Sequence, residues 1–329
     1  MEKRWNVYVT YRIAEPALEL LARHCQVEVN PHDRLLTREE LLAAVPGRDA
    51  VLCFPTDVID EEVLELAKGV KIFANNAVGY NNFDIPAATR RGVLLSNTPG
   101  VLTDATADLT FALLLATARR VVESDRWIRA GNFKLWRPND FLGLEISGKT
   151  LGIVGAGRIG QAVAKRALAF GMKIIYTSRR RYPDFEAATG AAWRDKKTLL
   201  QEADFISLHV PLTPETYHYI GEEELALMKP TAVLINAARG PVVDEKALVR
   251  ALREGQIWGA GLDVYEEEPM LAEGLADLPN VVLTPHIGSA TAETRTRMAL
   301  MAVENILAAM RGELPPNCLN PEAYQGGKE

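Results

Sequence analysis

Short runs of apolar, largely β-branched residues alternate with amphipathic stretches along almost the whole chain. A short apolar run predicts a strand, and apolar positions at helical spacing predict a helix. In the first part of the chain this pattern predicts strands at 7–10, 27–29, 50–54, 71–74 and 94–96, and helices at 15–24, 37–44, 60–68 and 85–91. Such alternation is typical of βαβ units around a parallel sheet. We therefore predict a complete small α/β domain before residue 100.

A long apolar segment follows this first domain. Residues 103–124 are predicted to form one helix, which opens with Thr103 and Asp104 as capping residues. Apolar side chains occupy more than one face of this helix. A helix of this kind is buried or is shared with a partner molecule.

A second α/β series runs from a strand at 150–154 to a strand at 281–284, and a C-terminal helix follows at about 291–311. We predict an α/β fold of two Rossmann-like domains with parallel sheets and an active site in the interdomain cleft. The predicted boundaries place residues 1–98 and 290–329 in a substrate-binding domain and 99–289 in a dinucleotide-binding domain.

Composition narrows the possible functions. The net charge of -6 and pI near 5.6 provide no basic field for nucleic acid. The three cysteines, Cys25, Cys53 and Cys318, match neither a disulfide framework nor a metal-binding spacing. The longest apolar segment is too short to span a bilayer, and no signal peptide is evident. We expect a soluble cytoplasmic protein without a metal and without a nucleic-acid or membrane partner.

A glycine-rich turn indicates a dinucleotide site. The apolar strand at 150–154 runs into a GxGxxG sequence, and a helix at 161–170 and a second strand at 173–177 follow. The glycines permit a tight turn, close approach of a pyrophosphate and close helix packing. The alternative is a purely structural glycine turn. The predicted contacts are Gly155, Ala156, Gly157, Arg158, Ile159 and Gly160.

The residues after the second strand predict which nucleotide is preferred. An acidic side chain there would bind the ribose hydroxyls of NAD, but the chain has Ser178, Arg179, Arg180 and Arg181 instead. A hydroxyl and guanidinium groups suit a 2′-phosphate. We predict NADP(H) as the preferred cofactor, with NAD(H) possible. The alternative is a solvated basic turn.

Three later segments each supply one reactive group at a predicted strand end. Arg239 could hold a carboxylate by two parallel hydrogen bonds, and His286 could donate a proton to a carbonyl oxygen that is being reduced. A neighbouring carboxylate, for which Glu268 is the candidate, favours the charged imidazole. Taken singly, the three residues could be a packed histidine, a surface ion pair and a solvated acidic turn. Their occurrence at strand ends of one dinucleotide domain favours a catalytic set.

Several motifs together resemble the D-isomer-specific 2-hydroxyacid dehydrogenase family. They are GIVGAGRIG, NAARGPVVDEKAL at 236–248, GLDVYEEEP, TPHIGSAT, AVGYNNFD at 77–84 and NTPGVLTDATADLTFALLLATARR at 97–120. The resemblance covers nearly the whole chain, and within the family the chain is most similar to glyoxylate and hydroxypyruvate reductases. Many relatives have Asp where this chain has Asn81, which concerns a turn more than catalysis.

The resemblance implies a role for each reactive residue. Arg239 would bind the substrate carboxylate with the N–H groups of Val78 and Gly79, and His286 would be the acid/base with Glu268 as its partner. A Trp matching Trp136 would reach the active site of the partner subunit in a homodimer formed through the helix at 103–124. The further expected cofactor contacts are Thr106, Ala237, Ala238, Arg239, Asp263, His286, Ile287 and Gly288.

Two other functions remain open at this point. The chain is also similar to co-repressors that sense nicotinamide nucleotides, and to dehydrogenases acting on phosphite, formate or 3-phosphoglycerate. The loop at 75–79 has no Arg or Lys to neutralise a phosphate, and the segment 54–56 is compact and largely apolar. We therefore expect a small unphosphorylated 2-oxo acid as substrate, with glyoxylate or hydroxypyruvate preferred.

Overall fold

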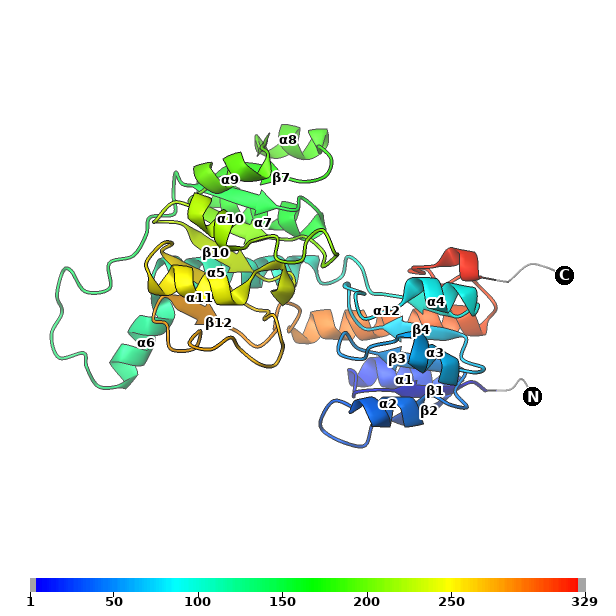
Figure 1. The fold of residues 1–329 in the computed structure, drawn as a ribbon. Helices are drawn as coiled ribbons and strands as arrows, with labels where there is room; N and C mark the ends of the chain where they lie inside the picture. Colours follow the sequence, from blue (N-terminus) through cyan, green and yellow to red (C-terminus); the bar gives the residue numbers. More distant parts are fainter. Residues whose placement is uncertain (1–3, 325–329) are drawn as a thin grey trace. The chain divides into compact units, whose positions relative to one another are not determined.

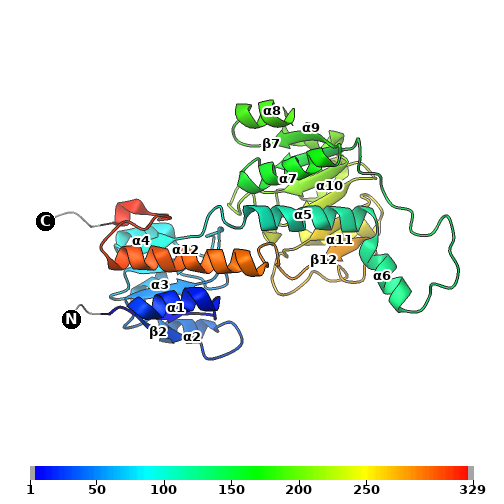
Figure 2. The same cartoon turned by 180° about the vertical axis from the view of Figure 1, so that it is seen from behind.

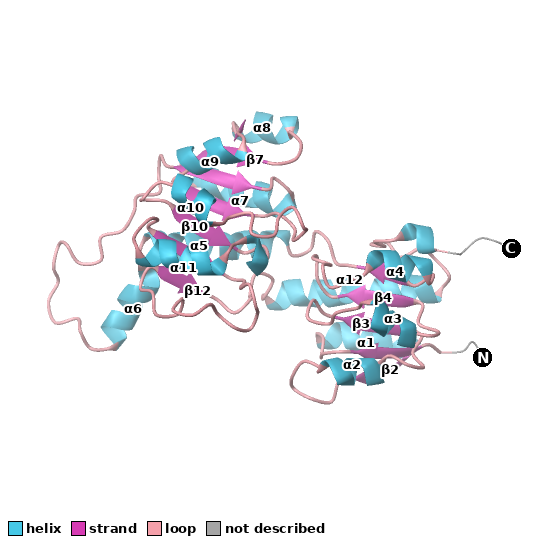
Figure 3. Cartoon of the chain, in the orientation of Figure 1, coloured by secondary structure: helices cyan, strands magenta, loops and turns pink. Residues whose placement is uncertain are grey.

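The computed structural model describes residues 4–324, which divide into two compact α/β units (Figure 1). Within the described range, the first unit contains the residues up to Leu102 and those from Ser289 onward, and the second is Thr103–Gly288. Each unit is built on one sheet whose strands are all parallel (Figure 3). The α/β fold with two parallel sheets that the sequence predicted is confirmed.

The first unit has a five-stranded sheet in the order β2-β1-β3-β4-β5. Helices α1 and α12 pack together on one face, where α12 contacts β3 and β4, and α2, α3 and α4 cover the other (Figures 1 and 2). The strands are β1 (Asn6–Val9), β2 (Gln26–Val29), β3 (Ala50–Cys53), β4 (Ile72–Asn75) and β5 (Leu94–Ser96). The helices are α1 (Glu15–His24), α2 (Arg38–Ala44), α3 (Glu61–Leu66), α4 (Ile85–Arg90) and α12 (Ala292–Met310).

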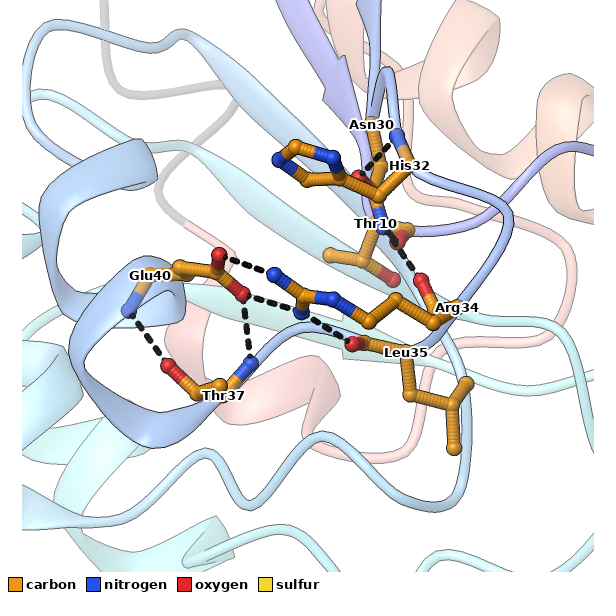
Figure 4. A network of polar contacts seen from close by, with 7 residues as sticks. All are labelled: Thr10, Asn30, His32, Arg34, Leu35, Thr37 and Glu40. Carbon is orange, nitrogen blue, oxygen red and sulfur yellow. Dashed lines mark hydrogen bonds and ion pairs between the residues drawn. The ribbon is translucent and has the colours of Figure 1, made fainter.

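Polar side chains order the loop that joins β2 to α2 (Figure 4). The Asn30 amide donates to the carbonyls of Thr10 and Arg34 at 2.9 and 2.8 Å. Arg34 in turn makes two hydrogen bonds to Glu40, at 2.7 and 2.6 Å, and together with the Thr37 N–H these bonds lower the pKa of that carboxyl to about 2. Glu40 and Thr37 form a capping box at the start of α2. The loop is thereby tied to the carboxyl end of the sheet.

The C-terminal segment closes the edge of the same sheet at β5. The buried Asn320 accepts a hydrogen bond from the Leu95 N–H at 2.8 Å and donates to the Val93 carbonyl at 2.9 Å. It also donates to the hydroxyl of Thr89 at 3.1 Å. These bonds satisfy backbone groups of an edge strand that would otherwise remain unpaired. This C-terminal segment therefore belongs to the first unit.

The second unit has a seven-stranded sheet in the order β12-β11-β10-β9-β6-β7-β8. Helices α5 and α7 cover one face, and α9, α10 and α11 cover the other (Figures 1 and 2). The strands are β6 (Thr150–Val154), β7 (Lys173–Thr177), β8 (Ala192–Trp193), β9 (Phe205–Leu208), β10 (Val233–Asn236), β11 (Gly259–Leu262) and β12 (Val281–Leu283). The helices are α5 (Thr103–Ala118), α6 (Val121–Arg129), α7 (Arg158–Ala169), α8 (Pro183–Thr189), α9 (Lys196–Glu202), α10 (Glu222–Leu227) and α11 (Glu245–Arg253).

The strand order reverses between β6 and β9, and this reversal is the usual site for a ligand in an open parallel sheet. The glycine turn follows β6 at this position. The order of the first sheet reverses in the same way between β1 and β3. Among the described residues, no helix is long and apolar enough to cross a membrane.

The prediction of one helix over residues 103–124 is wrong. The chain leaves α5 at Ala118, and α6 begins at Val121 after Arg120 adopts a left-handed conformation with φ 53°. The carbonyl of Ala118, which would continue the helix, instead accepts the N–H of Leu144 at 2.8 Å. Arg120 also forms two hydrogen bonds with Glu123, at 2.8 and 2.7 Å. A contact with a distant segment therefore ends a helix that the local apolar pattern would extend.

Candidate active site

The glycine turn between β6 and α7 leaves room for a dinucleotide. A Cβ at Gly155, which has φ 96°, would lie 2.8 Å from the His209 carbonyl, and one at Gly160 would lie 2.3 Å from the Gly155 oxygen. A Cβ at Gly157 would meet nothing within 4 Å. The chain's own packing thus requires two of these glycines, whereas the third borders open space.

The N-terminus of α7 faces this turn without a side-chain cap. Gly157 is the N-cap residue, and no side chain accepts a hydrogen bond there. The predicted contacts Arg158 and Ile159 are the first residues of the helix, and Ala156 is buried in the turn. Helix N-terminal N–H groups with the helix dipole behind them bind phosphate. These residues fit a dinucleotide pyrophosphate.

The three arginines of the basic turn after β7 have different surroundings. Arg181 forms an ion pair with Glu186 at 2.6 Å, and this lowers the pKa of the Glu186 carboxyl. Arg180 lies over the ring of Tyr182, 4.9 Å from its centroid. Arg179 is exposed. The pKa of the Glu215 carboxyl is lowered mainly by hydrogen bonds to Thr213 and to backbone, and to a smaller extent by the charge of Arg179. All three arginines are exposed, but Arg181 is held by an ion pair and Arg180 lies over an aromatic ring.

The turn after β10 carries Arg239 and is braced by Asn236, the last residue of the strand. The Asn236 side chain donates to the Arg239 carbonyl at 2.9 Å and accepts the N–H of Ala238 at 3.1 Å. The Arg239 Nη1 donates to the Ala238 carbonyl at 2.7 Å. Burial lowers the pKa of Arg239, and the charge of Glu268 partly offsets this effect. The turn containing Ala237, Ala238 and Arg239 is thus held in one conformation.

Asp263, at the end of β11, organises the loop that carries His286. Asp263 is 1% exposed, and its carboxylate accepts hydrogen bonds from the N–H groups of Ile287 and Gly288 at 2.7 and 2.8 Å. The Thr284 hydroxyl donates to the same carboxylate at 2.7 Å. Burial raises the pKa of Asp263, and these three hydrogen bonds oppose the rise. In this structure the Asp263 carboxylate therefore holds the loop after β12.

His286 meets Glu268 from this loop. The imidazole Nδ1 lies 2.8 Å from Glu268 Oε2, and the other carboxylate oxygen accepts the Tyr265 N–H at 3.0 Å. His286 has φ 52°, and its N–H donates to the carbonyls of Asp263 and Thr284 at 2.9 and 3.1 Å. A left-handed backbone is unusual for a residue with a Cβ, so these bonds are needed to maintain it.

The Glu268 carboxyl is ionised over the neutral range. Burial would raise its pKa, but the hydrogen bond and charge of His286, the Tyr265 N–H and the charge of Arg239 together lower it below its usual value. The carboxylate therefore remains a partner for an imidazolium until the pH falls through this lowered pKa. The pair remains accessible, with side-chain exposures of 43% for His286 and 34% for Glu268. The arrangement can store a proton on His286 and release it to a ligand.

Gly240 brings the turn with Arg239 against the turn with Glu268. A Cβ at Gly240 would lie 1.7 Å from the Tyr265 carbonyl oxygen and 2.5 Å from the Glu266 nitrogen. No side chain can occupy that space, so the two backbones touch only because residue 240 is glycine.

The other predicted contacts are distributed over both units. Thr106 lies beside Gly288, since a Cβ on that glycine would lie 3.4 Å from the Thr106 side chain. Val78 and Gly79 lie in the first unit on the loop after β4, and their carbonyls accept side-chain hydrogen bonds at 2.8 and 2.9 Å. Among residues 4–324, their N–H groups donate no hydrogen bond. Trp136 is 73% exposed on the loop that projects from the second unit, and the structure does not bring it to the other site residues.

Sequence reasoning missed three residues that shape the site. Asn236 had a signal, because it is a buried polar residue that ends an apolar strand just before Arg239. Gly240 and Tyr265 had none, since their contacts are with segments distant in sequence; the Tyr265 hydroxyl, for example, donates to the Thr284 carbonyl at 2.8 Å. The described residues contain no cluster of three or more His, Cys, Asp or Glu that could hold a metal ion.

Comparison with known proteins identifies close relatives. Residues 111–288 match the family model for the D-isomer specific 2-hydroxyacid dehydrogenase, NAD binding domain. The chain is 55% identical to the glyoxylate reductase of Thermococcus litoralis, covering 96% of this chain and 97% of that protein. A protein of known structure from Thermus thermophilus is 49% identical with a TM-score of 0.90, covering 95% and 99% of the two chains. An NADPH-dependent glyoxylate/hydroxypyruvate reductase from Sinorhizobium meliloti, solved with NADP and malonate, is 31% identical with a TM-score of 0.86, covering 99% and 100%.

Two glycine-to-alanine variants test this description of the site. Gly240→Ala should lower the free energy of unfolding by about 3 kcal/mol, because backbone atoms must move apart to admit the methyl group. Gly157→Ala should lower that free energy by only about 1 kcal/mol, the cost of alanine at a helix N-cap, but weaken binding of a nicotinamide dinucleotide, because its methyl group enters the space assigned to the pyrophosphate. Urea unfolding and nucleotide titration by fluorescence measure the two effects. Wild-type stability in Gly240→Ala, or wild-type nucleotide affinity in Gly157→Ala, would contradict the corresponding assignment.

Proposed function

Because this chain belongs to the D-isomer specific 2-hydroxyacid dehydrogenase family, we propose that it reduces glyoxylate or hydroxypyruvate to the 2-hydroxy acid, the D-isomer where the product is chiral. It is an oxidoreductase with a nicotinamide nucleotide as cofactor. The observation that carries the proposal is the His286–Glu268 pair, 2.8 Å apart and within electrostatic range of Arg239. This set provides one proton donor, one carboxylate to charge it and one cation for an anionic substrate.

Each reactive residue has a distinct task in the proposed reaction. Arg239 holds the substrate carboxylate and thereby orients the adjacent carbonyl. His286 donates a proton from Nε2 to the carbonyl oxygen as negative charge develops there, since its Nδ1 faces Glu268. A reduced nicotinamide nucleotide, when bound, would supply the hydride. Glu268 stays ionised and favours the imidazolium that must be present at the start of each reduction.

The proposal assigns the second substrate contact to the first unit. The N–H groups of Val78 and Gly79 belong to a loop whose carbonyls are already held by Asn97 and Asn75. Adjacent N–H groups of this kind bind a carboxylate oxygen. We therefore propose that the Val78 and Gly79 N–H groups bind the substrate carboxylate together with Arg239.

Small unphosphorylated acids suit the residues on the substrate loop. A phosphate group brings close to two negative charges, which a site normally meets with additional Arg or Lys. The residues of 75–79 include neither, and Asn75 is buried and donates to Gly79 and Asn82. Arg239 therefore matches the single carboxylate of glyoxylate or hydroxypyruvate.

NADP(H) is the proposed cofactor, with NAD(H) as a weaker alternative. Ser178, Arg179 and Arg180 follow β7 where an acid would select the ribose hydroxyls of NAD, and no acid is present there. The ion pair of Arg181 with Glu186 leaves Arg179 and Arg180 as the two guanidinium groups for a 2′-phosphate. Two such forks would bind that phosphate by charge-assisted hydrogen bonds.

A cytoplasmic homodimer is the proposed form of the enzyme. Helix α6 has no buried residue, and it projects with the loop that follows it from the rest of the second unit (Figure 1). A projecting segment rich in exposed apolar side chains favours burial against another molecule. The apolar side chains on this segment that are 50–73% exposed are Val121, Ile128, Phe133, Leu135, Trp136 and Leu142. In this dimer Trp136 would reach the partner's active site.

Steady-state kinetics with a panel of acids tests the activity. Glyoxylate and hydroxypyruvate should have higher kcat/KM than 3-phosphohydroxypyruvate, and phosphite should not be oxidised. His286→Ala should lower kcat by about two to four orders of magnitude through loss of the proton donor. Arg239→Ala should mainly weaken substrate use, and Glu268→Gln should shift the acidic or basic limb of the pH profile without abolishing turnover.

Three outcomes would contradict this proposal in different ways. A higher kcat/KM for the phosphorylated acid or for phosphite would overturn the substrate. Nearly normal turnover in His286→Ala would overturn the mechanism. Binding of NADPH without sustained oxidation in the presence of any 2-oxo acid would favour a sensing protein over an enzyme.

Replacing Arg179 and Arg180 together by Gln tests the cofactor preference. The KM for NADPH should rise by roughly tenfold or more, and the KM for NADH should change little, because only NADPH carries the 2′-phosphate. Arg181→Gln removes the same charge from the same turn and is the matched control; it should leave the ratio of the two values close to that of the wild type. An equal change in KM for NADPH and for NADH would show that the two arginines do not bind the 2′-phosphate.

Sedimentation equilibrium tests the dimer. The wild-type protein should sediment as a dimer, and the double variant Ile128→Asp, Leu135→Asp should sediment as a monomer because a buried carboxylate in an interface is costly. Turnover should fall with dissociation, since Trp136 would no longer reach a partner. Leu66→Asp changes a similarly exposed leucine in the first unit and should leave the dimer intact. A monomeric wild-type protein would rule out both the dimer and the role of Trp136.

A further inference from the structure

A second histidine–glutamate pair lies beside the proposed catalytic pair. His218 Nε2 lies 2.7 Å from Glu266 Oε1. Glu266 precedes Glu268 by two residues, and we call the segment 266–268 the acidic turn. The Tyr217 hydroxyl donates to the same oxygen at 3.4 Å, and its ring stacks on the His218 imidazole at 4.0 Å between centroids. Both rings come from the connection between β9 and α10. One oxygen of Glu266 is therefore fixed by a segment outside its own turn.

The other oxygen of Glu266 binds the start of α11. Glu266 Oε2 accepts the N–H of Glu245, the first residue of that helix, at 3.1 Å. A carboxylate is favoured at a helix N-terminus because the helix dipole places partial positive charge there. Helix α11 begins only a few residues after Arg239, so this bond ties the acidic turn to the segment that follows the arginine.

His218 adds a second link to the same segment. Its N–H donates to the Pro241 carbonyl at 2.8 Å, and the Ile220 N–H donates to the Val242 carbonyl at 3.0 Å. The connection between β9 and α10 is thus paired with the backbone directly after Gly240. Glu266 joins this connection, the start of α11 and the acidic turn through one side chain.

Both carboxylate oxygens of Glu266 are hydrogen-bonded at this junction. The titratable residues that contact Glu266 are Tyr217, His218 and Glu245, and the charges of Asp244 and Glu267 also act on Tyr217. Asp244 is occupied as the N-cap of α11. Glu245 is buried, and burial raises the pKa of its carboxyl, with the charges of Glu266 and Glu267 also raising it. Glu266 is therefore the carboxylate that bridges the three segments.

We propose that Glu266 is a positioning residue for the reaction, acting through the acidic turn on Glu268 and through α11 on the Arg239 turn. This inference rests on the proposed function for its kinetic consequences, but its geometry does not. With Glu266 in place, one of its carboxylate oxygens is bonded to His218 and the other to the N–H of Glu245, so the acidic turn is fixed and Glu268 stays in contact with His286. Without it, Gly240 still allows the two turns to touch, but the carboxylate that keeps them in register is lost.

The Tyr265 N–H reports this positioning independently of activity. It donates to Glu268 Oε1 at 3.0 Å, so its exchange with solvent measures how firmly the Glu268 carboxylate is held. In Glu266→Ala the Tyr265 amide should exchange about tenfold faster or more, whereas Glu267→Ala should leave it near the wild-type rate. Glu267 is the matched control because it is exposed and its loss removes the same charge from the same turn.

Kinetics form the second part of the test. Glu266→Ala should lower kcat/KM for glyoxylate by roughly tenfold or more and shift its pH profile, because a loosened Glu268 no longer holds the His286 imidazole in place. Glu266→Gln, which keeps acceptor and length, should recover part of this loss. His218→Phe keeps a ring to stack on Tyr217 but removes the bond to Glu266, and should change the profile in the same direction.

Two results would overturn the inference. One is a Glu266→Ala protein whose Tyr265 exchange and pH profile match those of Glu267→Ala. The other is a lower melting temperature in Glu266→Ala with Tyr265 exchange and the pH profile unchanged, which would make Glu266 a structural residue only. A wild-type protein that reduces no 2-oxo acid would contradict the proposed function, and the exchange comparison would then decide the positioning by itself.

Discussion

Three hydrogen-bond donors from the end of β12 converge on the buried carboxylate of Asp263, and the geometry of the proposed site depends on this convergence. The Thr284 hydroxyl and the N–H groups of Ile287 and Gly288 surround His286 in sequence, so the bonds hold that residue in its left-handed conformation. A buried carboxylate needs such partners to remain charged. Without these hydrogen bonds the loop would lose its conformation, and His286 would lose its contact with Glu268.

Several charged side chains of the second unit are paired with a charge of opposite sign. Glu268 is surrounded by His286, Arg239 and the Tyr265 N–H, and these partners outweigh the cost of burying it. In the turn after β7, Arg181 forms an ion pair with Glu186, whereas Arg180 lies over the Tyr182 ring and Arg179 is exposed. An isolated charge in either place would be costly or would bind ligands without selectivity. Pairing thus determines which charges are available to a substrate or a nucleotide.

Local patterns in the sequence predicted most of the elements and the residue types of the site. The apolar runs and helical spacings indicated strands and helices close to those observed, and both sheets are parallel as the alternation indicated. The turn with Gly157 and the residues Arg239, Glu268 and His286 could be singled out because each follows a predicted strand. Asn236 could have been found by the same reasoning. The helix break near Arg120 could not, because the Leu144 N–H that takes the Ala118 carbonyl belongs to a distant loop.

The sequence by itself determined the fold class, the dinucleotide turn and the family, because periodicity and motif spacing are properties of neighbouring residues. The tertiary structure decided which atoms meet. Only the folded backbone shows that the Tyr265 carbonyl occupies the space a side chain at residue 240 would need, and that Glu266 reaches both His218 and α11. Contacts of this kind join strand ends separated by many residues, and their distances depend on how the strands are paired and not on any short stretch of sequence.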